Sequence, residues 1–260
     1  MTLLELVRSV REQLNDLGGD GGGNVHWELD DTACLWKNTE IIRYLNLAHK
    51  ELAFRRPYRD SATDELCSLQ IRANTARYSL DPRILSIENV LLASTGKALI
   101  KTTLRDLRMW AAAKFTEPGV ELWKTKTGTP AYYSEDVEPG KITLIPVPVA
   151  TTDSLYLTVY RLPLEPFAWE SRTADFDEPV EAMVEALMAG SMARAYQKRD
   201  TETYDPRSIA QYENQFNQLV GAPVDYQTLE NRRWNANLDT SIIPAGYSRK
   251  SSRRTWMDNA

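Results

Sequence analysis

The chain has 260 residues, of which 42% are hydrophobic and 26% charged, ordinary values for a globular protein with one large or two small domains. No apolar run approaches the roughly 20 residues that cross a bilayer. Glu5, Arg8 and Arg11 interrupt the first apolar residues, so we expect no signal peptide and synthesis in the cytoplasm. Cys34 and Cys67 have no disulfide-scaffold or zinc-site spacing and are predicted to be small buried hydrophobes.

The net charge of −5 is unevenly distributed along the chain. Residues 221–260 hold six basic and four acidic side chains and carry +2, which leaves −7 on residues 1–220. A dedicated nucleic-acid-binding protein normally has a basic surplus, which this chain lacks. The sequence therefore indicates an acidic body followed by a weakly basic C-terminal segment.

The first predicted element is an amphipathic helix near residues 2–17. Thr2 and Glu5 have the spacing of a capping box. Apolar residues recur at spacings of four and three, which places on one face Leu3, Val7, Val10, Leu14 and Leu17. The glycine-rich segment 18–23 ends this helix and is predicted to be a flexible loop.

A second helix is predicted near residues 39–55, with Asn38 or Thr39 as its N-cap. Its apolar face has the same spacing and comprises Ile41, Leu45, Ala48 and Leu52. Either helix alone would leave an apolar stripe in water. We therefore expect the two helices to pack together.

The pattern changes to a period of two between residues 62 and 163, which indicates β-strands. Alternating apolar residues mark two of the strands: Cys67, Leu69 and Ile71 in one, and Leu155, Leu157 and Val159 in the other. Further strands are predicted at 78–80 and 83–92, a short helix at 103–113, and a hairpin about 138–140, where Pro and Gly suit a type II turn. This region is expected to be mostly antiparallel.

Two more helices are predicted near residues 179–199 and 206–220. The second is bounded by Asp205 as N-cap, Pro206 at the first helical position and Gly221 just past the end. Small residues in the first permit close helix packing: Ala189, Gly190 and Ser191.

These elements predict an α+β fold. Residues 1–61 and 164–221 would form a four-helix bundle from both ends of the chain. Residues 62–163 would form an inserted, mostly antiparallel β domain, and residues 222–260 an extended C-terminal arm.

The sequence offers few groups for catalysis, and motifs such as G-x-S-x-G, H-E-x-x-H, the Walker loop and C-x-x-C are absent from it. The best metal candidates are Asp175, Asp177 and Glu178, but acidic residues beside a helix N-terminus each gain ~0.3–1 kcal/mol from the helix dipole, and we favour that interpretation. His49, within a helix, is predicted to be solvated or partner-facing. We expect no catalytic residue, no metal, no cofactor and no enzymatic activity.

Seven tryptophans divide into two predicted groups. Those within the body are candidates for the core: Trp27, Trp36, Trp110 and Trp123. The segment 26–37 is predicted to be irregular, with Trp27, Leu35 and Trp36 as its anchors. The tryptophans outside any periodic pattern are predicted to lie on contact surfaces: Trp169, Trp234 and Trp256. Aromatic residues and arginine are enriched at protein interfaces, which supports the second assignment.

Several segments carry structural motifs in a fixed order over residues 1–220. They are Asn-x-Ala-x-x-Glu-Leu within 40–56, Tyr-x-Leu-Asp-x-Arg-Ile within 77–90, Gly-x-Pro-x-Tyr within 128–133, a strand leading to Pro-x-Pro at 142–148, and a helix junction over 196–216. The matching junction residues are Asp200, Glu202, Tyr212 and Phe216. Together these segments resemble the head-to-tail adaptor proteins of tailed bacteriophages, which dock beneath the portal ring.

The resemblance implies a structural neck protein of the virion, assembled in the host cytoplasm as a ring of about twelve copies. Its partners would be further copies of itself, the portal protein, and a nozzle or tube protein of the tail below. Genomic DNA would pass through the channel, as it must in DNA ejection, without sequence-specific binding. No membrane partner is implied.

The C-terminal arm, residues 222–260, has no hydrophobic period and could not offset the ~1–2 kcal/mol per residue that ordering its backbone costs. We predict that it extends from its own core and binds neighbouring subunits or the portal. The predicted anchors are its aromatic, Ile and Arg side chains: Tyr226, Arg232, Arg233, Trp234, Ile242, Ile243, Tyr247, Arg253, Arg254 and Trp256. The alternative is an arm folded back on its own bundle.

Three other functions remain open from the sequence. A tail-tube or stopper protein belongs to the same structural class, although four predicted helices argue against its usual β-rich fold. A nucleic-acid-binding module would use the basic arm, whose +2 is slight for phosphate binding. A hydrolase would rely on the acidic cluster at 175–178.

Overall fold

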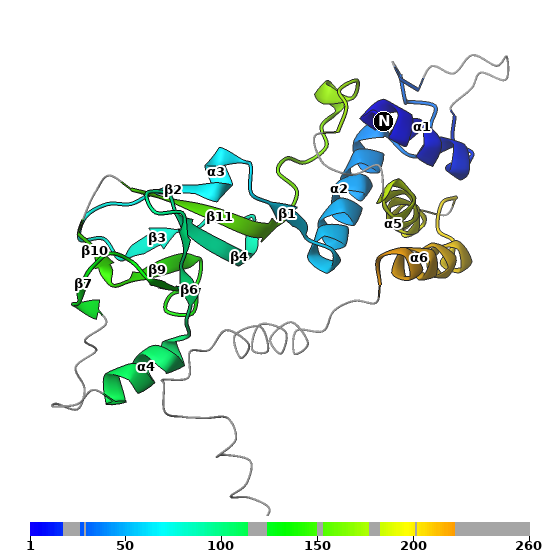
Figure 1. The fold of residues 1–260 in the computed structure, drawn as a ribbon. Coiled ribbons are helices and arrows are strands. Elements are labelled where there is room, and N and C mark those ends of the chain that lie inside the picture. The colour runs from blue at the N-terminus through cyan, green and yellow to red at the C-terminus, as the bar shows by residue number, and fades with distance from the viewer. Residues whose placement is uncertain are drawn as a thin grey trace, which may run out of the picture. The chain divides into compact units, whose positions relative to one another are not determined.

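A computed structural model gives the fold of the chain (Figure 1). It describes residues 1–17, 27–28, 30–113, 124–149, 153–176, 183–200 and 202–221, with the backbone alone at 109–113. Two compact units are present: residues 1–59 pack with the described part of 160–224, and residues 60–159 form the other unit. The mixed α+β class that the sequence predicts is confirmed.

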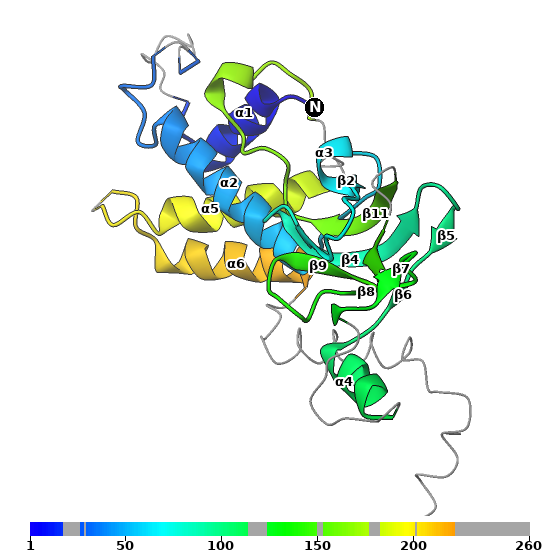
Figure 2. The same cartoon turned by 90° about the vertical axis from the view of Figure 1, so that its left-hand side faces the viewer.

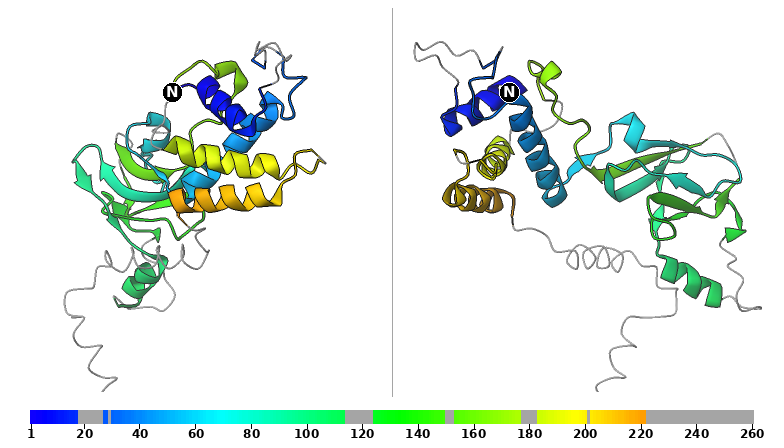
Figure 3. Two further views of the ribbon diagram at one scale, coloured as in Figure 1. Left: turned by 90° about the vertical axis from the view of Figure 1, so that its right-hand side faces the viewer. Right: turned by 180° about the vertical axis from the view of Figure 1, so that it is seen from behind.

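In its described residues, the first unit has four α-helices, two from each half of the chain around the inserted unit. They are α1 (Leu3–Leu14), α2 (Asn38–Arg55), α5 (Val184–Tyr196) and α6 (Pro206–Val220). Helices α5 and α6 lie side by side (Figure 2), and α2 crosses this pair steeply (Figure 3). Helix α1 packs on both α2 and α5, so the predicted packing of helices from the two chain ends is confirmed.

Helix α1 begins as the sequence predicts. The Glu5 backbone N–H donates to Thr2 Oγ1 over 3.2 Å, and the Thr2 N–H donates to Glu5 Oε2 over 2.8 Å. The helix ends at Leu14, earlier than the predicted residue 17, because Asn15 takes a left-handed conformation with φ of 53°. Four of the five predicted stripe residues are buried: Leu3, Val7, Val10 and Leu14.

Helix α2 starts one residue earlier than predicted, and the predicted N-cap is wrong. Lys37 is the N-cap residue, and its backbone N–H donates to Glu40 Oε2 over 3.0 Å. Asn38 is already helical, and its side chain binds residues outside α2 instead. The predicted apolar face is confirmed, since Ile41, Leu45, Ala48 and Leu52 are all fully buried.

Helix α6 has the predicted bounds. Asp205 Oδ1 accepts from the Arg207 N–H over 3.0 Å, Pro206 is the first helical residue, and Gly221 ends the helix with a φ of +98°. Helix α5 ends at Tyr196 rather than at residue 199. Its predicted start near residue 179 lies outside the described residues.

The described part of the second unit contains short helices and three sheets. The helices are α3 (Asp64–Cys67) and α4 (Leu104–Ala113), and the strands are β2 (Ser68–Gln70), β3 (Arg77–Ser79), β4 (Ile84–Leu92), β5 (Lys97–Ala98), β6 (Ile100–Lys101), β7 (Thr127–Gly128), β8 (Tyr132–Ser134), β9 (Lys141–Ile145), β10 (Val147–Pro148) and β11 (Ser154–Arg161). One sheet has the order β1-β11-β4-β5, where β1 is Tyr58–Asp60 and β2 also pairs with β11. The others have the orders β3-β9-β8-β6 and β10-β7.

The pairing in this unit is mixed. Strands β3, β8 and β9 pair antiparallel, whereas β6 pairs parallel with β8 and β7 pairs parallel with β10. The predicted hairpin is confirmed between β8 and β9, where Gly140 has a φ of +72°. The strand predicted from Cys67 is shorter than expected, because Cys67 ends a helical turn and β2 covers residues 68–70 alone.

Helix α5 lies very close to its neighbours at Gly190. A Cβ placed there would lie 2.9 Å from Ala48 Cβ and 3.0 Å from two ring carbons of Phe216. The missing side chain therefore lets α5 contact both α2 and α6. The small residues predicted to permit close packing do so at this position.

We predict that Gly190→Ala destabilises the protein. Overpacking against Ala48 and Phe216 outweighs the higher helix propensity of alanine, for a net loss of ~1–2 kcal/mol in the free energy of unfolding. Gly128→Ala is the matched control, because a Cβ at Gly128 would meet Pro146 at an ordinary 3.6 Å. Urea unfolding of both variants measures the difference, and equal midpoints would contradict the prediction.

Candidate docking site

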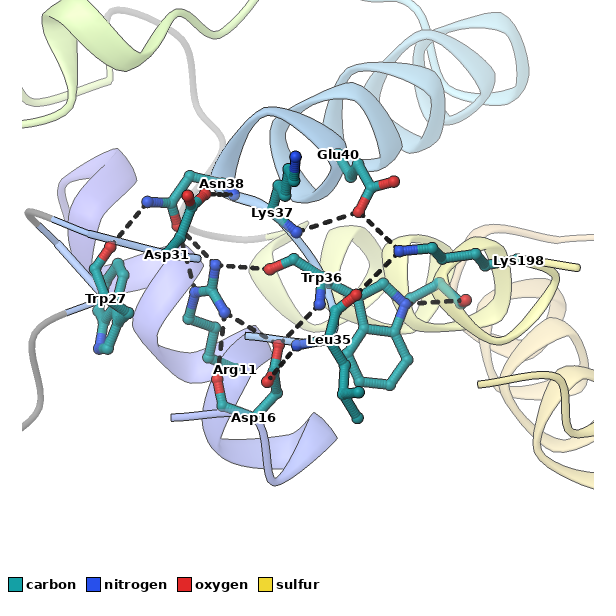
Figure 4. Close-up of polar contacts among 11 residues, drawn as sticks. Arg11, Asp16, Trp27, Asp31, Leu35, Trp36, Lys37, Asn38, Glu40 and Lys198 are labelled. Atoms are coloured by element: carbon teal, nitrogen blue, oxygen red, sulfur yellow. Dashed lines mark hydrogen bonds and ion pairs between the residues drawn. The ribbon is translucent and has the colours of Figure 1, made fainter. Parts of the chain in front are cut away.

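A buried arginine organises one side of the helical unit (Figure 4). Arg11 of α1 is fully buried. Its Nη1 donates to Asp16 Oδ2 over 3.0 Å, its Nη2 to the Trp36 carbonyl over 2.8 Å, and its Nε and Nη2 to Asn38 Oδ1 over 3.2 and 2.7 Å. The buried charge is thus paired and hydrogen-bonded, which such a charge requires.

Asp16 and Asn38 extend these contacts to the connection before α2. The Asp16 carboxylate accepts from the backbone N–H groups of Leu35 and Trp36 over 2.9 and 3.0 Å. Asn38 Nδ2 donates to the Trp27 carbonyl over 2.8 Å. This irregular connection is therefore held by polar contacts with α1, in addition to its apolar anchors.

Two of the three predicted anchors in this connection are confirmed. Trp27 and Trp36 are buried, and Trp36 Nε1 donates to the Ala195 carbonyl over 3.1 Å, which ties the connection to α5. Leu35 is 44% exposed, so its predicted anchoring role is wrong; its backbone carbonyl instead accepts from Lys198 Nζ over 2.8 Å. Cys67 is buried as predicted, whereas Cys34 is half-buried.

Lys198 also forms an ion pair with Glu40, with Nζ 3.0 Å from Oε2. Partial burial raises the pKa of Glu40, but the hydrogen bonds from the Lys37 N–H and from Lys198 outweigh it, so the pKa lies below its ordinary value. The carboxylate therefore stays ionised at neutral pH. This pair links the start of α2 to the end of α5.

A second ionic junction joins α2, α5 and α6. Glu51 of α2 pairs with Arg55 one turn later and with Arg194 of α5. Arg55 Nη1 also donates to Asn217 Oδ1 and to the Gly221 carbonyl, each over 2.7 Å. Glu51, Arg55, Arg194 and Asn217 line a pocket of about 290 Å³, and within it Glu51 pairs with both arginines.

The prediction that His49 is solvated or partner-facing is wrong. His49 is 2% exposed, its Nε2 lies 2.8 Å from the Tyr58 hydroxyl, and its ring stacks on Phe167 with centroids 4.8 Å apart. Residue 49 lies next to Ala48 on the buried face of α2. Its place inside the apolar stripe indicated burial.

Trp169, predicted to lie on a contact surface, packs within its own chain. Its ring centroid is 6.4 Å from that of Trp27, and the Arg172 guanidinium lies 4.9 Å from its ring. It remains half-buried rather than fully enclosed. The other two tryptophans of that group lie outside the described residues.

One face of α2 is exposed and carries an unusual mixture of side chains. The exposed positions recur at spacings of four, three and four: Arg43, Leu47, Lys50 and Phe54. We call this set the α2 stripe. Leu47 is 48% exposed and Phe54 49% exposed, so two large apolar side chains stand in water and alternate with the two cations along the stripe. Such a mixture is typical of a docking surface.

None of the ten predicted anchors of the C-terminal arm falls within the described residues, and neither do Asp177 and Glu178. Among the described residues, no group of three His, Cys, Asp or Glu side chains could hold a metal ion. Within those same ranges, no helix has the length and apolar character needed to span a bilayer.

We predict that Arg11→Met destabilises the protein strongly. The change leaves the buried Asp16 carboxylate without its cation, and breaking such a pair costs ~3–5 kcal/mol. Arg8→Met is the matched control on the same helix, because the Arg8–Glu28 pair is largely exposed and worth less than ~1 kcal/mol. Thermal unfolding by circular dichroism measures both, and similar midpoints would refute the role given to Arg11.

These features describe a packed helical unit with one exposed, partly apolar helix face. The comparison with protein families agrees: the model of the SU10 adaptor protein family matches residues 1–241. The chain belongs to this family and is a phage head-tail adaptor, as the motif resemblance predicts. The family is one of structural phage proteins rather than of enzymes. No curated protein matches the chain significantly.

Proposed function

We propose that the protein forms a ring of about twelve copies that joins the portal to the tail in the virion neck. The match to the SU10 adaptor protein family over residues 1–241 carries this proposal. Adaptors of this kind contact portal and tail proteins. The α2 stripe supports a self-assembling role, because exposed Leu47 and Phe54 gain free energy when a partner covers them.

The ring would enclose the DNA channel. Residues 1–220 carry a net charge of −7, and an acidic wall repels the phosphates of passing DNA. A basic wall would retain DNA through counterion release. The acidic body therefore fits a channel through which DNA moves without specific binding, and the +2 of residues 221–260 is too small to favour the alternative of a nucleic-acid-binding module.

The C-terminal arm is the proposed connection to other subunits. Residues 222–260 alternate aromatic and basic side chains, which suits binding to apolar pockets with acidic edges. We propose that it binds neighbouring copies or the portal through the anchors predicted from the sequence. The free subunit has no template for ring closure and is expected to be monomeric.

Electron microscopy of the protein mixed with its portal tests the ring. We expect a closed ring on the portal and, by light scattering, a monomer in the absence of the portal. Interfaces that repeat by rotation are heterologous and do not close at two copies. A tight, closed dimer of the free protein would therefore contradict this proposal.

We propose that the α2 stripe contacts a second copy of the chain. Arg43 and Lys50 are seven residues apart, and the exposed acids Glu5 and Glu12 of α1 have the same separation, about 10.5 Å along each helix. Two matched charge pairs could thus form between α2 of one copy and α1 of the next. Leu47 and Phe54 would be removed from water in the same contact.

The double variant Leu47→Ser with Phe54→Ser should therefore leave the fold intact and weaken ring formation. Both side chains are about half exposed, so we expect little change in the thermal midpoint. The fraction of portals that carry a ring, counted in micrographs, should fall at least tenfold. Tyr204→Ser is the control, since Tyr204 is 56% exposed but lies off α2. Unchanged ring occupancy in the double variant would remove the stripe from the interface.

A further inference from the structure

The helical unit contains a second pocket, which the internal ionic contacts do not occupy. It has a volume of about 230 Å³ and lies where the segment 164–176 packs beside α1 and α2. Its apolar and aromatic lining includes Leu3, His49, Phe167 and Phe176. We call this the strap pocket, after the strap formed by residues 164–176.

The strap pocket is held in shape from two sides. Asn46 of α2 clamps Phe167, with its Oδ1 accepting from the Phe167 N–H over 2.7 Å and its Nδ2 donating to the Phe167 carbonyl over 3.0 Å. The Phe167 ring lies between His49 and Phe176, with centroids 4.8 and 5.2 Å away. At α1, the Leu4 N–H donates to the Arg172 carbonyl over 2.9 Å. The pocket is thus largely preformed, which lowers the entropy cost of binding.

The edge of the strap pocket is acidic. Glu165 and Asp175 both line it and are exposed, and the Asp175 side chain is 85% accessible. Among the described residues, the lining includes no lysine or arginine. The N-terminal amino group of Met1 lies 3.7 Å from Asp175 and offsets part of this charge. An aromatic group flanked by cations would complement both the apolar floor and the acidic edge.

We infer that the strap pocket of one copy receives Trp234 of a neighbouring copy, with Arg232 and Arg233 paired to Glu165 and Asp175. This inference rests on the proposed ring. The sequence Arg232-Arg233-Trp234 supplies two cations beside an indole, which is the chemistry that the pocket lacks. The indole buries its apolar body on Phe167 and Phe176. The arginines reach the exposed carboxylates at the edge.

The length of the arm agrees with a neighbouring copy as the host. The arm leaves the helical unit at Gly221, whose carbonyl accepts from Arg55 at the end of α2. The stretch from Gly221 to Trp234 reaches about 43 Å when extended, against about 22 Å for the whole of α6. A ring interface is heterologous, so an arm on one copy and a pocket on the next satisfy it. Trp256, which follows Arg253 and Arg254, lies on a longer tether and has a lower effective concentration.

The test uses the full chain with the photoreactive residue p-benzoylphenylalanine in place of Trp234. Normal and heavy-isotope copies are mixed, assembled on the portal and irradiated, and the cross-linked peptides are identified by mass spectrometry. We expect cross-links to the strap, residues 164–176, that join normal with heavy copies. The double variant Glu165→Lys with Asp175→Lys should lower their yield at least tenfold.

Two controls separate the pocket from general charge effects. Glu170→Lys changes an exposed acid of the same strap that does not line the pocket, and it should leave the yield unchanged. A fourfold variant that adds Arg232→Glu and Arg233→Glu to Glu165→Lys and Asp175→Lys exchanges the charges of arm and pocket. The cross-link yield should then be restored. Circular dichroism confirms that each variant is folded.

The possible results distinguish this inference from the ring itself. One result would overturn the inference and leave the proposed function standing: rings form, but the cross-links lie outside residues 164–176 or only within single copies. A yield that falls equally with Glu170→Lys overturns it as well. If micrographs of the same samples show no ring, the proposed function and this inference fail together.

Discussion

The helical unit depends on one buried ion pair, between Arg11 and Asp16. A fully desolvated guanidinium is tolerable because its donors all face acceptors that belong to the protein. The same groups fix the chain that precedes α2, so the position of α2 on α1 follows from this charge. The exposed stripe and Asn46, which binds Phe167 of the strap, both belong to α2, so contacts that position α2 also position them. An apolar replacement could fill the space but would not specify that geometry.

Most helices and several strands could be predicted from the sequence, because apolar spacing reports which face of an element is buried. The hairpin at 138–140 followed from its Pro-Gly pair. Helix ends were less predictable, since the left-handed turn at Asn15 and the cap at Lys37 use residue types that are not preferred at those positions over their neighbours. The single-turn helix that ends at Cys67 was also hard to predict, because four residues are too few to show a helical period of apolar side chains.

The candidate site was harder to predict, because its residues depart from the usual pattern of buried apolar and exposed polar side chains. Arg11 stands four residues after Val7 and three before Leu14, so a charge occupied the apolar face of α1, and this was the available signal for a buried ion pair. His49 carried the same signal on α2. The α2 stripe could have been read from Leu47 and Phe54, seven residues apart on the polar face. The strap pocket had no such signal, because its walls come from segments more than 100 residues apart.

The insertion of residues 60–159 between the two halves of the helical unit also has a consequence during synthesis. Helices α1 and α2 leave the ribosome well before α5, and at about 5–20 residues per second the delay is on the order of ten seconds. Throughout this interval α1 and α2 can pack on each other but lack α5, which contacts both of them. The Arg11 contacts with Asp16 and Asn38 span fewer than 30 residues, and they can form as soon as α2 emerges. These polar contacts hold α1 and the start of α2 together until α5 and α6 have been synthesised and can pack on them.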